Sequence, residues 1–135
     1  RFWLALYDAG FTPRLLAPHE EQELLAWGMG ITNIVPRATA TAAEITPAEL
    51  AAGSESLIAK IRLYRPRALA VLGIIAYRAA FHHPTATLGR QDLTIGDTAL
   101  WALPNPSGLN AHYRLKDLAA WYQRLREEVE NMDTA

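Results

Sequence analysis

Apolar side chains recur every three or four residues in five parts of the chain, the spacing that places them on one face of a helix. In the first and last of these segments the pattern includes Phe2, Leu6, Leu118 and Tyr122. Glycine or proline follows several of the segments and indicates where a helix ends. The pattern predicts helices over residues 2–9, 19–27, 54–65, 75–82 and 114–130.

Runs of apolar and β-branched residues predict the strands. Ala68–Leu72 is apolar throughout, as is typical of a strand buried on both faces of a parallel sheet. Residues 93–95 and 98–103 flank Gly96-Asp97, which predicts a hairpin with a two-residue turn. The run Ile31–Val35 predicts a further short strand.

The segment before the third predicted helix carries a local start signal. Thr46-Pro47-Ala48-Glu49 has the form of a capping box with proline at the first helical position. In the helix predicted over residues 54–65, the apolar face should consist of Leu57, Ile58, Ile61 and Tyr64.

Helices and strands alternate along the chain, and no internal repeat or interdomain linker is evident. Alternation of this kind is typical of an α/β domain in which helices cover a mostly parallel sheet. The 135 residues, half of them hydrophobic, are enough to enclose a core. We therefore predict a single domain over residues 1–135 with a three-layer α/β/α architecture.

Composition removes several functional classes. No apolar run approaches the length of a membrane span, and no signal-peptide pattern is present, so we expect a cytoplasmic protein without membrane contact. The chain has no cysteine, which excludes disulfides and cysteine-ligated zinc or iron–sulfur sites. The net charge of −1 is not that of a typical DNA-binding protein. Basic side chains in predicted loops, such as Arg37 and Arg90, could form a local basic face or be ordinary solvated charge.

Ligands of α/β sheets bind beyond the carboxyl ends of the strands. The predicted strands place three such ends at residues 33–37, 73–75 and 104–110. The first and third are polar, and a binding site is expected there. From its residue type alone, Asn105 could bind a ligand or could bond to its own backbone in a turn.

The loop Pro104-Asn105-Pro106-Ser107-Gly108-Leu109-Asn110 is the most informative stretch of the sequence. Prolines and glycine make it stiff, and it carries one bare apolar side chain, Leu109. A leucine at such a position can fold back onto the core. It can also act as a wedge between the bases of a duplex.

The sequence Asn-Pro-Ser-Gly-Leu-Asn at residues 105–110 resembles the second motif of the mismatch-specific uracil-DNA glycosylases, bacterial relatives of thymine-DNA glycosylase. Supporting matches fall in that family's order along nearly the whole chain: Arg1-Phe2-Trp3, Ala9-Gly10-Phe11-Thr12, Gly30–Val35, Arg65-Pro66-Arg67 and Leu93–Gly96. The resemblance implies an α/β fold with a short, mostly parallel sheet.

The sequence departs from that family at its first motif. Gly-Ile-Asn-Pro-Gly, on the family's first strand, carries the asparagine that positions the attacking water, and it occurs nowhere in this chain. In the family that motif precedes the match at Arg1, as does the aromatic residue that stacks on the flipped base. The resemblance therefore implies an N-terminally incomplete domain without its first strand, with an unknown catalytic residue and little activity on its own.

The resemblance implies two base-binding residues and several DNA contacts. Asn33 and Asn105 would contact the flipped base. Ser107 and Gly108 would offer backbone N–H groups to a phosphate or to the widowed base, and Leu109 would be the wedge.

Two further residues keep alternatives. Asn110 would contact DNA or cap the last helix. Arg37 would pair with a phosphate or be a surface arginine.

The resulting hypothesis is a monofunctional DNA glycosylase that removes uracil, or thymine and related lesions, opposite guanine. Its partner would be double-stranded DNA with a G·U or G·T mismatch, and it would act as a monomer in the bacterial cytoplasm, on the nucleoid. The mechanism implies no metal and no other cofactor. Two alternatives remain: a non-catalytic DNA-binding domain of the same fold, and an unrelated α/β domain that binds a small ligand.

Overall fold

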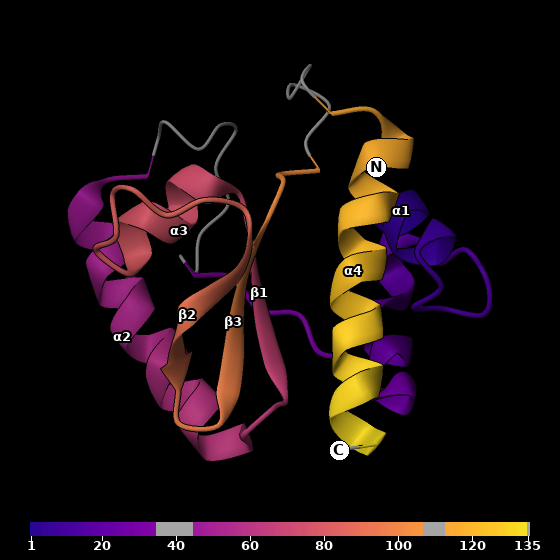
Figure 1. The fold of residues 1–135 in the computed structure, drawn as a ribbon, viewed down its shortest axis with the longest axis horizontal. Helices are drawn as coiled ribbons and strands as arrows, with labels where there is room; N and C mark the ends of the chain where they lie inside the picture. Colours follow the sequence, from indigo (N-terminus) through magenta and orange to yellow (C-terminus); the bar gives the residue numbers. More distant parts are fainter. Residues whose placement is uncertain (35–44, 107–112, 135) are drawn as a thin grey trace. The chain divides into compact units, whose positions relative to one another are not determined.

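A computed structural model describes residues 1–34, 45–106 and 113–134 of the chain. Within these ranges the order of elements is α1 (Phe2–Asp8), the 3₁₀ helix η1 (Pro18–Trp27), α2 (Pro47–Tyr64), β1 (Ala68–Leu72), α3 (Ile74–Ala80), β2 (Gly89–Ile95), β3 (Thr98–Leu103) and α4 (Leu115–Thr134) (Figure 1). They form two compact units. The sheet unit is Asn33–Ala102, and the helical unit joins Arg1–Thr32 to Leu103–Ala135.

The sheet has the strand order β1-β3-β2. β2 is antiparallel to β3, with Ile95 opposite Thr98 and Gly89 opposite Ala102. β1 runs in the same direction as β3 (Figure 1), so the sheet is mixed. At the start of this parallel pair, the backbone N–H of Ala99 donates to the carbonyl of Arg67 over 3.0 Å. The carboxyl ends of β1 and β3 therefore lie at the same edge of the sheet.

The hairpin between β2 and β3 forms where the sequence predicts it. Gly96 occupies the turn with a φ of 57°, a conformation that costs glycine little and other residues more. β2 begins at Gly89, earlier than predicted, and its pairing with β3 is irregular between Arg90 and Thr94.

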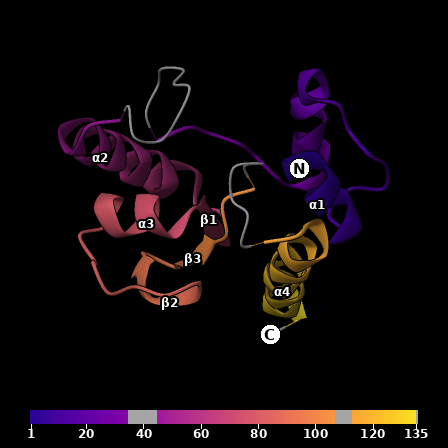
Figure 2. The ribbon, with the colours of Figure 1, turned by 90° about the horizontal axis from the view of Figure 1, so that it is seen from above.

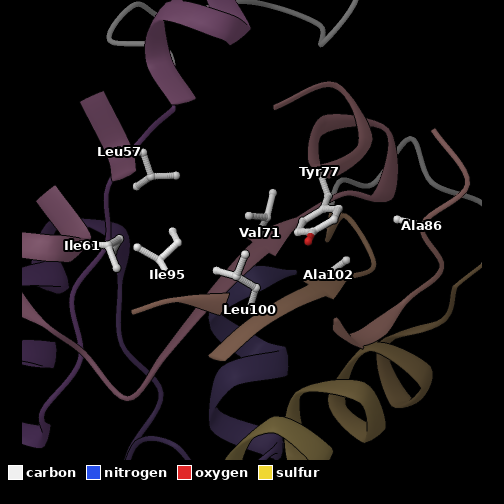
Figure 3. Close-up of a cluster of buried hydrophobic side chains, with 8 residues drawn as sticks. All are labelled: Leu57, Ile61, Val71, Tyr77, Ala86, Ile95, Leu100 and Ala102. Carbon is white, nitrogen blue, oxygen red and sulfur yellow. The ribbon is translucent and has the colours of Figure 1, made fainter. Parts of the chain in front are cut away.

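Helices α2 and α3 lie on the same side of the sheet, as the two ribbon views agree (Figure 2). Between them and the sheet is one cluster of buried side chains (Figure 3), made of Leu57, Ile61, Val71, Tyr77, Ala86, Ile95, Leu100 and Ala102. Every element of the sheet unit contributes to this cluster, so burial of its apolar surface is the main force that holds the unit together.

The start of α2 confirms the predicted capping box. Thr46 Oγ1 accepts a hydrogen bond from the backbone N–H of Glu49 at 3.1 Å, and the backbone N–H of Thr46 donates to Glu49 Oε1 at 3.2 Å. Pro47 is the first helical residue. The helix therefore begins directly after its cap, at Pro47. The periodicity of apolar residues predicts a later start, at residue 54.

The helical unit is built on the packing of α1 against α4. Its buried apolar positions include Ala5 and Leu6 of α1 and Leu118, Tyr122 and Leu125 of α4. At the end of α1, Arg126 Nε donates to the carbonyl of Ala9 over 2.6 Å. Leu118 and Tyr122, which the sequence pattern places on the apolar face of this helix, are thus buried as predicted.

Four details differ from the sequence-based expectations. Residues 31–34 form no strand, because the described part of this segment pairs with no other strand. Residues 18–27 form a 3₁₀ helix, in which only Leu24 is buried and Leu25 is 70% exposed. Tyr64 is 74% exposed, since Ile61 is the last buried residue of α2. The α/β class and the short sheet are confirmed. The predicted mostly parallel arrangement is wrong, because β2 pairs with β3 in the antiparallel direction and the sheet is therefore mixed.

Candidate functional site

The first part of the candidate site is the end of β3. All six residues of this strand are buried, and Pro104, which follows it, is fully buried as well. Asn105 is the first exposed residue after the strand. A buried strand and a proline with a restricted φ thus carry an exposed amide to the carboxyl edge of the sheet.

Arg1 contacts both ends of the segment that follows Asn105. Its Nε donates to the carbonyl of Pro106 at 3.3 Å, and its Nη1 donates to the carbonyl of Tyr113 at 2.6 Å. No sequence pattern predicts this role for Arg1. The one available signal was its place in the Arg1-Phe2-Trp3 match.

Helix α4 begins shortly after this segment, at Leu115. The backbone N–H of Arg114 donates to Asp117 Oδ2 at 3.0 Å, and the carbonyl of Arg114 accepts from the backbone N–H of Leu118 at 3.0 Å. Arg114 therefore occupies the cap position of this helix. Asn110, the alternative cap for this helix, lies outside the described residues.

Asn33 is exposed and lies in the segment before α2. The neighbouring Ile34 approaches α2 so closely that a Cβ on Gly53 would lie 2.0 Å from the carbonyl oxygen of Ile34. Glycine in the middle of a helix is otherwise unfavourable by about 1 kcal/mol relative to alanine. Gly53 therefore allows the segment that carries Asn33 to rest on the helix, a role that no sequence pattern predicts.

The predicted site residues fall into three groups. Asn33 belongs to the sheet unit, and Asn105 belongs to the helical unit. The remaining predicted contacts lie outside the described residues; they are Arg37, Ser107, Gly108, Leu109 and Asn110.

The carboxyl end of β1 is apolar, as expected. Gly73 has a φ of 113° and joins the strand directly to α3, whose second residue, Ile75, is 78% exposed. This end offers no polar side chain to a ligand. The polar strand-end residues predicted from the sequence are therefore those in the segments that carry Asn33 and Asn105.

Two buried tyrosines remain protonated. Burial raises the pKa of Tyr77 and, more strongly, that of Tyr122, where the positive charge of Arg1 opposes the shift. Both hydroxyls are buried, and among the described residues neither has a hydrogen-bond partner. A neutral phenol inside an apolar core is not a base, so both side chains serve packing.

Metal ligands and membrane-spanning helices are absent from the described ranges. No group of three or more histidine, aspartate or glutamate side chains is placed there to hold a metal ion. His82 and His83 are both exposed. Within the same ranges, no helix is long and apolar enough to cross a membrane.

Comparison with known protein families identifies the chain. The family described as the uracil DNA glycosylase superfamily matches residues 1–127. The chain belongs to the uracil-DNA glycosylase superfamily. The match includes both units, and membership implies a DNA glycosylase that acts on DNA and hydrolyses the N-glycosyl bond of a base such as uracil. Membership also removes the alternative of an unrelated α/β domain that binds a small ligand.

Proposed function

We propose that this member of the uracil-DNA glycosylase superfamily is a monofunctional, monomeric enzyme that removes uracil paired with guanine in duplex DNA. The observation that carries the proposal is the exposure of Asn105 directly after the buried β3 and Pro104. Asn105 also begins the Asn-Pro-Ser-Gly-Leu-Asn sequence, which resembles the second motif of the mismatch-specific branch. Both features support a base-reading amide at the strand end.

The chemistry of asparagine suits a flipped uracil. The side-chain amide offers two donors and an acceptor on a short arm, and the edge of uracil presents both donors and acceptors. Flipping costs a few kcal/mol and costs least where the base pair is weak. A G·U mismatch therefore favours extrusion, and Leu109 would offset part of the lost stacking by filling the vacated space.

The reaction is a hydrolysis. The oxygen of water forms a bond to the sugar C1′ while the N-glycosidic bond breaks, and the bonding electron pair leaves with the uracil. The water proton is released to solvent or to the departing base. Groups placed to stabilise positive charge on the sugar and negative charge on uracil would lower the barrier most.

Two exposed asparagines are the candidates for contact with the base. No Gly-Ile-Asn-Pro-Gly sequence occurs among the 135 residues, so the proposal assigns contact with the base to Asn33 and Asn105, and the experiment removes the amide of Asn105. Loss of a hydrogen bond that leaves a partner unpaired typically costs about 1–3 kcal/mol. For Asn105→Ala this corresponds to a five- to 150-fold lower rate of uracil release, at about 1.4 kcal/mol per factor of ten.

The test joins the chain to an upstream segment that carries the family's first motif, Gly-Ile-Asn-Pro-Gly, because the chain on its own is expected to have little activity. It measures single-turnover release of the base from four matched oligonucleotides: G·U, A·U and G·T duplexes and single-stranded uracil. We expect release to be fastest from the G·U duplex and to fall in Asn105→Ala with an unchanged melting temperature. Asn131→Ala, an exposed asparagine on α4, is the matched control and should keep wild-type rates.

Other outcomes would contradict the proposal in distinct ways. Equal rates on G·U and A·U duplexes would rule out mismatch specificity. Tight binding of G·U duplex without any release would favour the alternative of a non-catalytic DNA-binding domain. Wild-type kinetics in Asn105→Ala would return Asn105 to the role of a turn residue.

A further inference from the structure

We propose that Arg1 is a positioning residue that holds together the two ends of the segment between β3 and α4. The proposal rests on the proposed function of this segment, and it adds a residue that acts on the segment from outside. Its basis is the pair of hydrogen bonds from one guanidinium to the carbonyls of Pro106 and Tyr113.

One planar group makes both contacts. The guanidinium carries five N–H donors in a fixed fork, and here Nε and Nη1 reach two carbonyls that are seven positions apart in the sequence. Both bonds are charge-assisted, and such bonds are stronger than those between neutral groups. Because the donors belong to one rigid group, the two bonds set the distance between the ends of the segment.

Each end is also attached to a well-packed element. Pro106 follows the buried Pro104 by two residues. Tyr113 precedes Arg114, whose backbone N–H is bonded to Asp117 in the first turn of α4. The Arg1 contacts therefore connect Pro106, shortly after the chain leaves β3, to Tyr113, shortly before the chain enters α4.

The packing of α1 keeps Arg1 in reach of these carbonyls. The ring of Phe2 lies against that of Tyr122, with 6.3 Å between the centroids. The carbonyl of Arg1 accepts the hydrogen bond from the backbone N–H of Ala5 at 2.9 Å, so the backbone of Arg1 is fixed at the start of the helix. The α1–α4 packing thus determines where the guanidinium lies.

The consequence concerns uracil release from a duplex. Asn105 and the predicted DNA contacts at Ser107, Gly108 and Leu109 all lie in or beside the segment whose ends Arg1 joins. A misplacement of about 1 Å can lower the rate of a catalysed reaction 100-fold. Loss of Arg1 should therefore lower activity without any contact between Arg1 and DNA.

The test compares Arg1→Gln and Arg1→Lys with Arg126→Gln. Arg126 is a close control, because it also bonds a backbone carbonyl far away in the sequence, that of Ala9, within the same helix pair. We expect Arg1→Gln to lower kcat/KM on the G·U duplex about tenfold or more, with a smaller loss on single-stranded uracil. Arg126→Gln should lower the melting temperature at least as much and keep the wild-type rate.

The lysine variant separates geometry from charge. A single ammonium cannot reproduce the fork that bonds both carbonyls, so Arg1→Lys should resemble Arg1→Gln. Full activity in Arg1→Lys would overturn the proposal, because charge alone would then be sufficient. A salt slope of binding lowered by about 1 in Arg1→Gln would indicate a phosphate contact instead, and would also overturn it.

A second measurement does not depend on catalysis. Amide hydrogen exchange of a peptide covering residues 104–115 should be faster in Arg1→Gln than in wild type and in Arg126→Gln. Unchanged exchange would overturn the positioning role even if the protein releases no uracil. Faster exchange together with no release from wild type would support the role of Arg1 and contradict the proposed function.

Discussion

At the scale of single residues, two small features support the segments that carry the candidate site. Arg1 bonds to both ends of the segment after Asn105, and Gly53 leaves room for the backbone beside Asn33. Neither residue has a side chain that would be chosen for base chemistry. Their roles follow from where the fold brings distant parts of the chain together.

Gly53→Ala should destabilise the protein even though alanine is the better helix former. The gain in helix propensity is about 1 kcal/mol, but the new Cβ would lie 2.0 Å from the carbonyl oxygen and 2.9 Å from the carbonyl carbon of Ile34. Overpacking of this kind costs about 1–3 kcal/mol, so a net loss of stability is expected. Denaturant unfolding measures it.

Gly30→Ala is the matched control, because a Cβ at Gly30 would meet open space. This variant should be as stable as wild type. If Gly53→Ala were more stable than wild type, the close approach of Ile34 to α2 would not exist in solution. If Gly53→Ala is destabilised as expected, its uracil release under conditions where it is fully folded reports whether Asn33 depends on that approach.

At the scale of elements, local sequence signals were reliable where all the necessary partners are near in the sequence. The capping box at Thr46–Glu49 and the turn at Gly96-Asp97 formed as predicted. Ala68–Leu72 also forms a strand, but only Val71 of it is buried, so the predicted burial on both faces is wrong. Ile31–Ile34 failed as a strand, because β-branched residues indicate only a propensity, and a strand needs a neighbour to accept its hydrogen bonds.

The start of η1 contains a charge cluster that makes the stability of this element depend on pH. Glu20 accepts hydrogen bonds from Arg14 and from the backbone N–H of Ala17, and these lower its pKa from 4.5 to about 2. A lowered pKa means that the folded state binds the proton less readily than the unfolded state. The contribution of Glu20 is therefore present above pH 4.5 and is lost as the pH falls toward 2.

Melting temperatures across this range should show the effect. Wild type should lose stability between pH 4.5 and pH 2, and Glu20→Gln should lose less, because glutamine does not titrate. Glu127→Gln, on the exposed surface of α4, serves as the control and should follow wild type. Parallel curves for wild type and Glu20→Gln would contradict the shifted pKa.

At the scale of the whole molecule, membership of the uracil-DNA glycosylase superfamily spans residues 1–127 and therefore includes both units. Of the two predicted base-binding residues, Asn33 belongs to the sheet unit and Asn105 to the helical unit. The proposed activity involves the whole protein bound to a DNA duplex. The predicted wedge, Leu109, can act only in that complex, because it would fill the space that a flipped base leaves in the stack.

Leu109→Ala should impair uracil release from a G·U duplex more than from single-stranded DNA. A wedge offsets unstacking, which costs a few kcal/mol in a duplex and little in a single strand. Single-turnover rates on the two substrates give the ratio, and Leu109→Met, which preserves apolar bulk, should retain most of the duplex activity. Equal losses on both substrates would remove the wedge role.

By itself the sequence determined the α/β class, the positions of most helices and strands, and the resemblance that the family match bears out at the level of the superfamily. These depend on periodicity, turn residues and short motifs, which act over a few neighbouring positions. Only the tertiary structure decided that Arg1 bonds to Pro106 and Tyr113, that Ile34 rests on Gly53, and that residues 31–34 pair with no strand. Such contacts join residues far apart in the chain, so no local pattern encodes them.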